Sequence, residues 1–381
     1  MASPLAAPSR EGAGISARLR LAEEVAGALA AGRPVVALES TLISHGLPFP
    51  VNLEVAAGAE EAVRGAGATP ATVAIRDGQI LVGLGRDDLV ALASSPPGSV
   101  RKASRSSLAG ALARKGWAAT TVSATMIVAR AAGIAVFATG GIGGVHRGAF
   151  GGVLGGSSGT AAEAPPEAAG PGPVSDVRTD LAAPASTTRP TAGRPPSLDV
   201  SVDLEELART PVAVVCAGPK AILDVAGTIE WLEGRGVPVL VIGQREVPGF
   251  WCRTSGVPAP DTAADVAEAA KVVATHLELG LGSGILVCVP VPESAALPDD
   301  LGRAAVERAV AEAEAAGIGG AALTPWLLGR IAELTDGASL RANAALIVEN
   351  ARVAGELARR VAGERTGRVT GSSVRRVPGE D

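Results

Sequence analysis

The sequence is poor in aromatic residues and contains no tyrosine. Phe, Trp and Tyr make up only 2% of its 381 residues, whereas hydrophobic residues make up 47%. A core must therefore be built from Ala, Val, Leu and Ile, and the chain is long enough to bury a large one. The net charge of -5 and the lack of a basic run before the C-terminal tail disfavour a nucleic-acid partner.

Cysteine is also scarce, and long uninterrupted apolar runs are missing. The three cysteines, Cys216, Cys252 and Cys288, are far apart, and an odd number argues against a disulfide framework. The N-terminus lacks a signal-peptide pattern. Arg130 and several glycines interrupt the most apolar stretch, residues 117–145, which is typical of a buried helix and strand rather than a membrane span. We expect a reduced, cytoplasmic protein without a membrane segment.

Three segments consist mainly of small and polar residues without hydrophobic periodicity. Residues 1–14 and 364–381 are predicted to be disordered ends. Residues 150–197, rich in Gly, Ala and Pro, are predicted to be a flexible insertion. The sequence therefore predicts one catalytic domain over residues 15–363 that contains this insertion.

Outside these segments, short apolar runs alternate with helical patterns. A hairpin is predicted over residues 72–84, with Asp77-Gly78 as its turn. The alternation indicates an α/β layered fold. Val- and Ile-rich runs predict strands buried on both faces at residues 34–39, 134–138, 212–216, 237–242 and 285–289. Helices are predicted over residues 15–31, 52–65, 104–115, 121–132, 261–279, 304–316, 325–334 and 340–362.

Lys220 stands just beyond the predicted strand at residues 212–216. Ligands of α/β sheets gather at the carboxyl ends of strands, where a poorly hydrated amine can attack a carbonyl carbon. The alternative is a solvated loop lysine, which position alone favours. The chain has only four lysines among many arginines. Because arginine cannot readily lose its proton, a lysine kept in this composition slightly favours a chemical role.

Glu39 ends the predicted strand at residues 34–39. A carboxyl group at the apolar end of a strand can have a raised pKa and act as a general acid. The alternative is a cap of the following turn or helix, and position alone does not decide between the two.

Two polar segments provide further candidate sites. In D-V-S-V-D, an extended backbone would place Asp199, Ser201 and Asp203 on one face, as an oxygen set suited to Mg²⁺ or Mn²⁺. The alternative is a helix N-cap at Ser201 or Asp203, and both interpretations can hold together. The glycine-rich segment from Thr139 to His146 follows a strand and is a candidate phosphate loop, or else a tight turn that needs positive φ angles.

Several long motifs along the chain resemble the pseudouridine-5'-phosphate glycosidase family, which includes indigoidine synthase A-like proteins. The resemblance runs from about residue 15 to 362, apart from the insertion. Its longest stretches are A-L-E-S-T-L-I-S-H-G-L-P-F-P from Ala37, F-A-T-G-G-I-G-G-V-H-R-G from Phe137, D-V-S-V-D-L-E-E-L-A from Asp199 and V-V-C-A-G-P-K from Val214.

The resemblance implies a lyase or glycosidase of nucleotide metabolism. It would split pseudouridine 5'-phosphate reversibly into uracil and ribose 5-phosphate, through a lysine Schiff base and with Mn²⁺. By motif position, Lys220 would be the Schiff-base lysine, Glu39 the general acid and Asp199 the metal-associated carboxylate. The implied substrate contacts are Lys102, Val122, Ser201, Val202, Asp203, Thr139, His146 and Asn343. The implied structure is a homotrimer of α/β/α subunits, each with a central mixed sheet.

The sequence departs from the resemblance at two places. The insertion at residues 150–197 separates two motifs that should reach one pocket, and Val289 stands where some relatives carry asparagine. Two other functions therefore remain open. One is a different lysine-dependent sugar-phosphate lyase or aldolase, and the other is a non-catalytic accessory subunit with the same fold.

Overall fold

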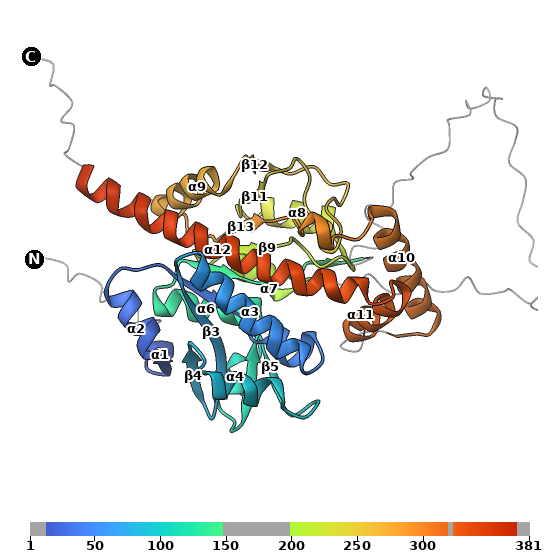
Figure 1. Ribbon diagram of the computed structural model, residues 1–381, viewed down its shortest axis with the longest axis horizontal. Helices are drawn as coiled ribbons and strands as arrows, with labels where there is room; N and C mark the ends of the chain where they lie inside the picture. The colour runs from blue at the N-terminus through green and yellow to red at the C-terminus, as the bar shows by residue number, and fades with distance from the viewer. Residues whose placement is uncertain (1–12, 148–198, 319–322, 372–381) are drawn as a thin grey trace, which may run out of the picture. The chain divides into compact units, whose positions relative to one another are not determined.

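The computed structural model describes residues 13–147, 199–318 and 323–371 (Figure 1). By its internal contacts the chain divides into a main unit, residues 1–146 and 200–381, and a second unit, residues 147–199. Of the second unit only Arg147 and Asp199 are described. The predicted insertion and most of the two predicted disordered ends lie outside the described residues.

A large sheet forms the centre of the main unit, and its middle strands are all parallel. From one side the parallel strands follow the order β3, β2, β7, β9, β13, β11 and β12. Their bounds are β3 Thr69–Arg76, β2 Val35–Leu38, β7 Val136–Ala138, β9 Ala213–Cys216, β13 Ile285–Cys288, β11 Val239–Ile242 and β12 Asp261–Ala263. Every residue of β2, β7, β9 and β13 is buried, which explains their continuous Val- and Ile-rich sequences.

The sheet becomes mixed at the outer half of β3. There β3 pairs antiparallel with β4 Gln79–Val82 and with β6 Trp117–Thr120, and β1 Leu19–Leu21 and β5 Arg101–Ala103 extend these two strands. The predicted hairpin turn is confirmed, because Asp77 and Gly78 have φ values of 50° and 79°. A separate two-stranded ribbon joins β8 Val145–His146 to β10 Leu223–Asp224.

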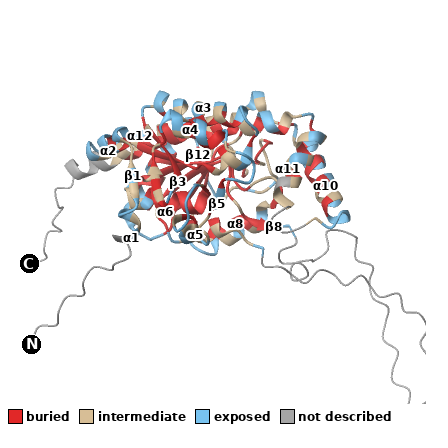
Figure 2. Cartoon of the chain, turned by 90° about the horizontal axis from the view of Figure 1, so that it is seen from below, coloured by how far each residue is buried: buried red, intermediate tan, exposed pale blue. Residues whose placement is uncertain are grey.

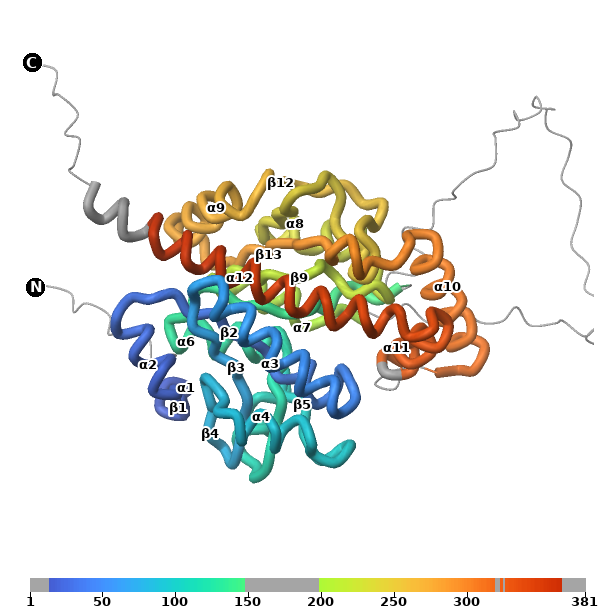
Figure 3. Tube along the Cα trace, in the orientation of Figure 1, coloured from blue at the N-terminus to red at the C-terminus, as the bar shows by residue number. Residues whose placement is uncertain are grey.

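Helices cover both faces of the sheet. Figure 2 shows α3 Val51–Gly65 and α12 Ala338–Gly371 on one side of the buried strands, with α6 Val122–Ala132 and α8 Val225–Glu233 on the other. The predicted α/β class, with a layered core and a central mixed sheet in a single domain, is therefore confirmed. The long helix α12 packs against α3, α9 Val266–Leu279 and the strands β2, β7 and β9 (Figure 3).

Smaller elements complete the main unit. The helices α10 and α11 pack against each other near one end of α12 (Figure 3). A π-helical turn, η1, directly follows the segment that carries Glu39. The bounds are α1 Ala13–Ser16, α2 Glu23–Ala30, η1 Leu42–Gly46, α4 Arg86–Ala93, α5 Leu108–Leu112, α7 Val202–Leu207, η2 Glu293–Ala295, α10 Asp299–Ala315 and α11 Leu323–Leu334. Within the described ranges, no helix is long and apolar enough to cross a membrane.

Three predicted helices follow a different course in the structure, and two others have different bounds. α10 begins at Asp299 instead of residue 304, and α12 continues to Gly371, into the C-terminal segment that was predicted to be disordered. The single helix expected over residues 15–31 is wrong, because Leu19–Leu21 pairs with β4 and separates two short helices. The helix over residues 104–115 shrinks to Leu108–Leu112, because the hydroxyl groups of Ser104 and Ser107 hydrogen-bond within the preceding turn.

The third difference concerns residues 261–279, which begin as strand β12 before α9 starts. Asp265 caps this helix: its carboxylate accepts the N–H of Glu268 at 2.9 Å. The Glu268 carboxylate in turn accepts the N–H of Ala264, the residue before the cap, at 2.7 Å.

Candidate active site

The site lies where three neighbouring parallel strands end. Glu39 directly follows β2, Thr139 directly follows β7, and Lys220 lies four residues beyond the end of β9. Because β7 pairs with both β2 and β9 in parallel, the three residues come to the same carboxyl edge of the sheet. The apolar strands thus place a carboxyl, a hydroxyl and an amine beside one another.

Glu39 is held by its neighbours at this edge. Its side chain is buried, and its Oε1 accepts a hydrogen bond from the Thr139 hydroxyl. The backbone of Thr139 is fixed from the other side by Asn350 of α12, whose Nδ2 donates to the carbonyls of Thr139 at 2.9 Å and Gly140 at 3.3 Å. One helix thus fixes the strand end that supports the carboxyl group.

Burial raises the pKa of Glu39 above its ordinary value, and the neighbouring charges modify this shift. The positive charge of Lys220 is the largest opposing influence on the pKa, followed by the hydrogen bond from Thr139. The negative charge of Asp203 adds to the rise, and Lys102 opposes it. A carboxyl that keeps its proton toward neutral pH can serve as a general acid.

Lys102 belongs to the same electrostatic cluster. It lies on β5 and is exposed, yet its pKa is lowered. The largest cause is the partial removal of water from the amine, and the second is the positive charge of Lys220. Glu39 and Asp203 oppose this shift in pKa. Because the charges that shift the pKa of Glu39 and of Lys102 must lie near these two groups, Lys220 and Asp203 belong to the same cluster.

The loop that carries Lys220 is shaped by its backbone. Gly218 adopts a φ of 84°, and its N–H donates to the Cys216 sulfur at 3.3 Å. The Lys220 N–H then donates to the carbonyl of Ile142 at 3.2 Å, which ties this loop to the glycine-rich segment. Further along, Leu223 pairs with His146, so the predicted site residue His146 lies on the ribbon beside the lysine loop.

Asp203 connects two elements of the site. One carboxylate oxygen accepts the N–H of Ser123 at 3.0 Å, and the other accepts the N–H of Gly143 at 3.1 Å. Ser201 caps α7 by accepting the Asp203 N–H at 3.2 Å. The prediction of an extended segment with its three oxygen side chains on one face is therefore wrong, because the chain turns into α7 at Val202, whereas the alternative N-cap at Ser201 is confirmed.

Val122 and Val202 both lie at helix starts in this region. Val122 is the first residue of α6 and Val202 the first residue of α7, and the two helices pack against each other. The bond from the Ser123 N–H to Asp203 joins their N-terminal ends. The structure thus brings the valines that the resemblance assigned to substrate binding close to the charged cluster.

The glycine-rich segment is built for close packing within the protein. The N–H groups of Thr139, Ile142, Gly143 and Val145 all donate to protein acceptors. These four groups are therefore not available for the phosphate binding that the sequence suggested. Nor do Gly140, Gly141, Gly143 and Gly144 have positive φ angles. A Cβ on Gly141 would instead lie 2.5 Å from the Phe250 ring, and one on Gly143 would collide with the Ser201 hydroxyl.

The family of the chain follows from its match to a known sequence model. The model described as indigoidine synthase A like protein matches residues 24–152 and 191–360, well over half of the chain. The chain belongs to this family. The resemblance inferred from the motifs is therefore confirmed, and the unmatched residues 153–190 fall within the predicted insertion.

Several members of the family carry one name. The pseudouridine-5'-phosphate glycosidase of Paracoccus denitrificans is 47% identical over 340 residues, covering 89% of this chain and 97% of the relative. Its namesake in Deinococcus radiodurans is 44% identical over 340 residues and covers 89% of this chain and 94% of the relative.

Two solved structures share the fold. The prealnumycin C-glycosynthase AlnA, solved in complex with ribulose 5-phosphate, is 33% identical, with a TM-score of 0.74 over 92% of this chain and 98% of that chain. An indigoidine synthase A-like protein from Thermotoga maritima is 30% identical, with a TM-score of 0.70 over 90% of this chain and 96% of that chain.

The predicted metal ligand of this family member is Asp199. Asp199 belongs to the second unit, so its role stays a prediction. Among the residues that the structure describes, no three His, Cys, Asp or Glu side chains gather in a way that could hold a metal ion. Asp203 already uses both carboxylate oxygens for backbone N–H groups. The described residues alone therefore do not form the expected oxygen site.

Two asparagines on α12 have different relations to the site. Asn343, a predicted substrate contact, is half-buried, and its role stays a prediction. Asn350 was missed by the sequence analysis, although it is 1% exposed and fixes the Thr139 backbone. Seven residues separate them, so both lie on one side of the helix, about 10 Å apart along its axis. A polar residue amid the apolar stripe of α12 was the available signal for Asn350.

An ion pair between a buried glutamate and a partly exposed arginine was also missed beside the site. Glu206 of α7 is 1% exposed, and its carboxylate accepts from Arg105 at 2.5 Å and from the Thr210 hydroxyl. The backbone N–H of Arg105 donates to the Ser123 hydroxyl at 3.2 Å. This pair fastens α7, and with it Asp203, to the segment that follows Lys102. No local pattern signals it, because 101 residues separate the partners.

Proposed function

We propose that the chain cleaves the carbon–carbon glycosidic bond of pseudouridine 5'-phosphate, reversibly yielding uracil and ribose 5-phosphate, in the breakdown of pseudouridine. The observation that carries this proposal is the pairing of Lys220 with a buried Glu39 at one edge of the sheet. The names of the family members support the substrate. AlnA, a C-glycosynthase solved with ribulose 5-phosphate, supports both C-glycoside chemistry and a pentose 5-phosphate ligand in this fold.

The base leaves from carbon, so protonation of a leaving nitrogen cannot drive the reaction. In the proposed first stage, the unprotonated Lys220 amine bonds to C1' while the bond from C1' to the ring oxygen breaks. Glu39 gives its proton to that oxygen, which becomes a hydroxyl, and the amine passes one proton to water. The raised pKa of Glu39 suits this role.

The second stage breaks the glycosidic bond. The uracil carbon takes up a proton from water as its bond to C1' breaks, and the nitrogen lone pair of Lys220 forms the C1'=N double bond. Water then hydrolyses this imine, which frees ribose 5-phosphate and the lysine. The remote phosphate supplies binding energy that orients the sugar.

The other residues of the cluster are proposed as substrate contacts. Lys102 would hold an anionic or carbonyl oxygen, and Val122 and Val202 would contact the substrate at the starts of α6 and α7. Ser201 and Asp203 would act there with Thr139. His146 and Asn343 would add polar contacts from the ribbon and from α12.

We also propose that the enzyme depends on Mn²⁺, with Asp199 as its protein ligand. Mn²⁺ prefers oxygen ligands, and divalent ions of this kind are commonly held by one carboxylate with waters and a substrate phosphate. Treatment with EDTA should abolish uracil release, and added Mn²⁺ should restore it. An Asp199→Asn variant should need more Mn²⁺ for half-maximal rate, whereas unchanged activity in EDTA would contradict the metal dependence.

A substrate panel tests the proposed function. Uracil release is measured for pseudouridine 5'-phosphate, unphosphorylated pseudouridine and uridine 5'-phosphate. We expect rapid release from the first compound alone. Turnover of another sugar phosphate without uracil release would favour a different lysine-dependent lyase or aldolase, and no turnover by a folded sample supplied with Mn²⁺ would favour an accessory subunit. Trimeric assembly and a cytoplasmic location are further predictions.

A further inference from the structure

A small cavity lies behind the Glu39 carboxyl group. Its volume is about 10 Å³, and its polar lining residues are Glu39, Thr72 and Thr139. This is close to the volume that one water molecule needs, and such a water also needs at least two polar partners. The cavity is thus suited to one water molecule beside the proposed general acid.

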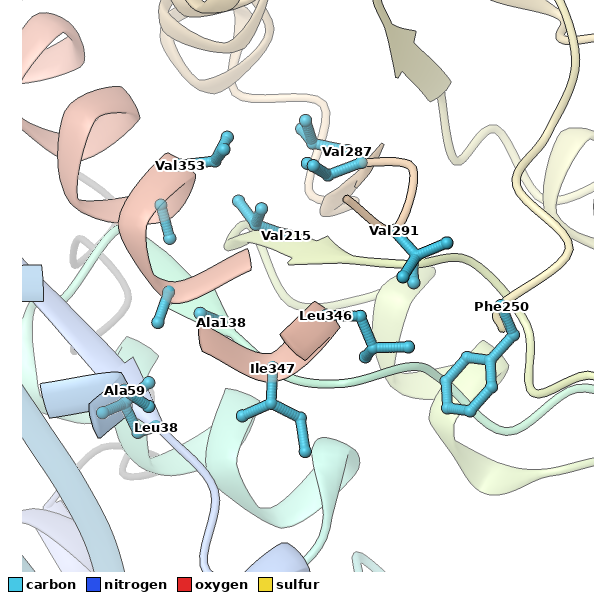
Figure 4. Packing of buried hydrophobic residues seen from close by; sticks show 14 of the residues in the cluster. Leu38, Ala59, Ala138, Val215, Phe250, Val287, Val291, Leu346, Ile347 and Val353 are labelled. Carbon is cyan, nitrogen blue, oxygen red and sulfur yellow. The ribbon is translucent and has the colours of Figure 1, made fainter. Parts of the chain in front are cut away.

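The rest of the cavity wall is aliphatic. Figure 4 shows four of its residues, Leu38 of β2, Ala59 of α3, Ala138 of β7 and Ile347 of α12, which meet from four elements. Substrate binding does not account for a threonine in this wall, because Thr72 faces α3. Thr72 is only 2% exposed, and it stands beside Leu38 in the register of β3 with β2.

Thr72 connects the cavity to a second carboxyl group. Its Oγ1 donates to the Oε1 of Glu60 at 2.5 Å. Glu60 lies half-buried on α3, and burial raises its pKa above the ordinary value. The hydrogen bond from Thr72 and the positive charge of Arg64 oppose this rise, and the negative charge of Glu24 adds to it. Arg64 and Glu24 form an exposed ion pair at 2.5 Å. Glu60 therefore reaches from a buried hydroxyl toward the solvent.

The proposed reaction needs a proton supply at Glu39. This carboxyl gives its proton to the ring oxygen while Lys102 and Lys220 occupy its substrate side together with the sugar. A hydroxyl can donate and accept at once, so a chain of a carboxyl, a hydroxyl and a water can move a proton without moving heavy atoms. The back of Glu39 offers such a chain.

We propose that Glu60, Thr72 and a water in the cavity return a proton to Glu39 after each turnover. Protonated Glu60 gives its proton to the Thr72 oxygen, and Thr72 releases its own hydroxyl proton to the water. The water releases a proton to the Glu39 carboxylate. Each transfer breaks one O–H bond and forms another, and Glu60 regains its proton from the solvent. This path rests on the proposed role of Glu39 as the general acid.

The test compares Thr72→Val and Glu60→Gln with two controls. Thr72→Ser keeps the hydroxyl, and Glu61→Gln changes a neighbouring exposed carboxylate on the same helix. Thr72→Val and Glu60→Gln should lower kcat for uracil release about tenfold with KM unchanged, and should enlarge the solvent deuterium isotope effect on kcat. Both controls should stay within about twofold of the wild type, and thermal melts should show that all variants fold.

An infrared measurement tests the path independently of turnover. The carboxyl band of protonated Glu39, assigned by its loss in Glu39→Gln, should exchange with D₂O more slowly in Thr72→Val and Glu60→Gln than in the wild type. The proposal is overturned if both folded variants exchange and turn over like Glu61→Gln. If the wild type releases no uracil, the proposed function fails. The exchange rates then test the proton path from Glu60 to Glu39 by themselves.

Discussion

At the scale of single residues, the site works by placing charges where water is scarce. Glu39 and Lys220 are ordinary side chains whose chemistry depends on their position at the ends of buried strands. Burial raises the pKa of Glu39, while Lys220 and the Thr139 hydroxyl restrain that rise. The net effect is a pKa above the ordinary value for glutamate.

Replacing Glu39 by glutamine tests this assignment. Because Glu39 must be protonated to act as an acid, activity should fall as the pH rises through its pKa, which lies above the ordinary value. Glu39→Gln should lower kcat about 10²- to 10⁴-fold and remove that limb of the pH profile. The measurement is kcat for uracil release across a series of pH values.

Thr139→Val is the companion variant. It removes the hydrogen bond that lowers the pKa of Glu39, so the limb of the pH profile should move to higher pH instead of vanishing. A Glu39→Gln profile with an unchanged limb would exclude Glu39 as the acid.

Glu39 also affects stability, because the folded chain holds the proton of this carboxyl more tightly than the unfolded chain. The contribution of Glu39 to the free energy of unfolding is full below its pKa in the unfolded chain and is lost as the pH rises through its pKa in the folded chain.

At the scale of secondary-structure elements, α12 holds the edge of the sheet on which the site is built. It crosses β2, β7 and β9 and places Asn350 under the Thr139 and Gly140 carbonyls. The Asn350 Oδ1 is buried and has no hydrogen-bond partner in the described part of the chain. Asn350 thus fixes the end of β7 through its Nδ2, while its Oδ1 stays unsatisfied.

The two asparagines of α12 should separate stability from function. Asn350→Leu leaves two buried carbonyls without their side-chain donor, so it should lower the free energy of unfolding by about 1–3 kcal/mol. Asn343→Ala should change this free energy by less than about 0.5 kcal/mol while raising KM. Urea denaturation and steady-state kinetics measure both effects. Equal stability losses would show that the two residues have the same structural role.

The sequence predicted strands better than local loops and caps. The Val- and Ile-rich runs identified β2, β7, β9, β11 and β13 within one or two residues, because burial on both faces leaves an unambiguous pattern. The break at Leu19–Leu21 could not be predicted, since it depends on pairing with β4, which lies some sixty residues further along. The positive φ angles considered for the glycine-rich segment are wrong for the same reason: distant side chains, such as Phe250, explain why its residues are small.

The candidate site was only partly predictable. Strand-end position made Glu39 and Lys220 candidates without deciding their roles, and the polar segments added Thr139 and Asp203. The motif resemblance assigned roles to these residues and added Lys102, and the structure brings the five together. Neither approach reveals Asn350 or the pair of Arg105 with Glu206, because these contacts join segments about a hundred residues or more apart. The structure alone connects Glu60 to the back of the site.

At the scale of the whole molecule, the active site depends on the main unit. The family model omits residues 153–190, and the described residues on either side, Val145 and Val200, form a β-bridge. Closing such a loop costs little more when it is long than when it is short. We therefore expect the charged cluster to form without residues 153–190.

Replacing residues 153–190 with a short Gly/Ser linker should leave kcat within about threefold and the free energy of unfolding within about 1 kcal/mol. Uracil release and urea denaturation measure the two quantities. The same deletion in a Glu39→Gln background is the inactive control. A loss of activity in a folded deletion variant would instead give the segment a direct part in the reaction.

The most direct test of the account is to trap the sugar on its lysine. The full chain is incubated with ribose 5-phosphate, reduced with borohydride and digested for mass spectrometry. We predict one stable sugar adduct on Lys220, lost in Lys220→Ala together with turnover and retained in Lys115→Ala, a variant of an exposed lysine. An active wild type with no adduct, or with its adduct on a different lysine, would contradict the covalent mechanism.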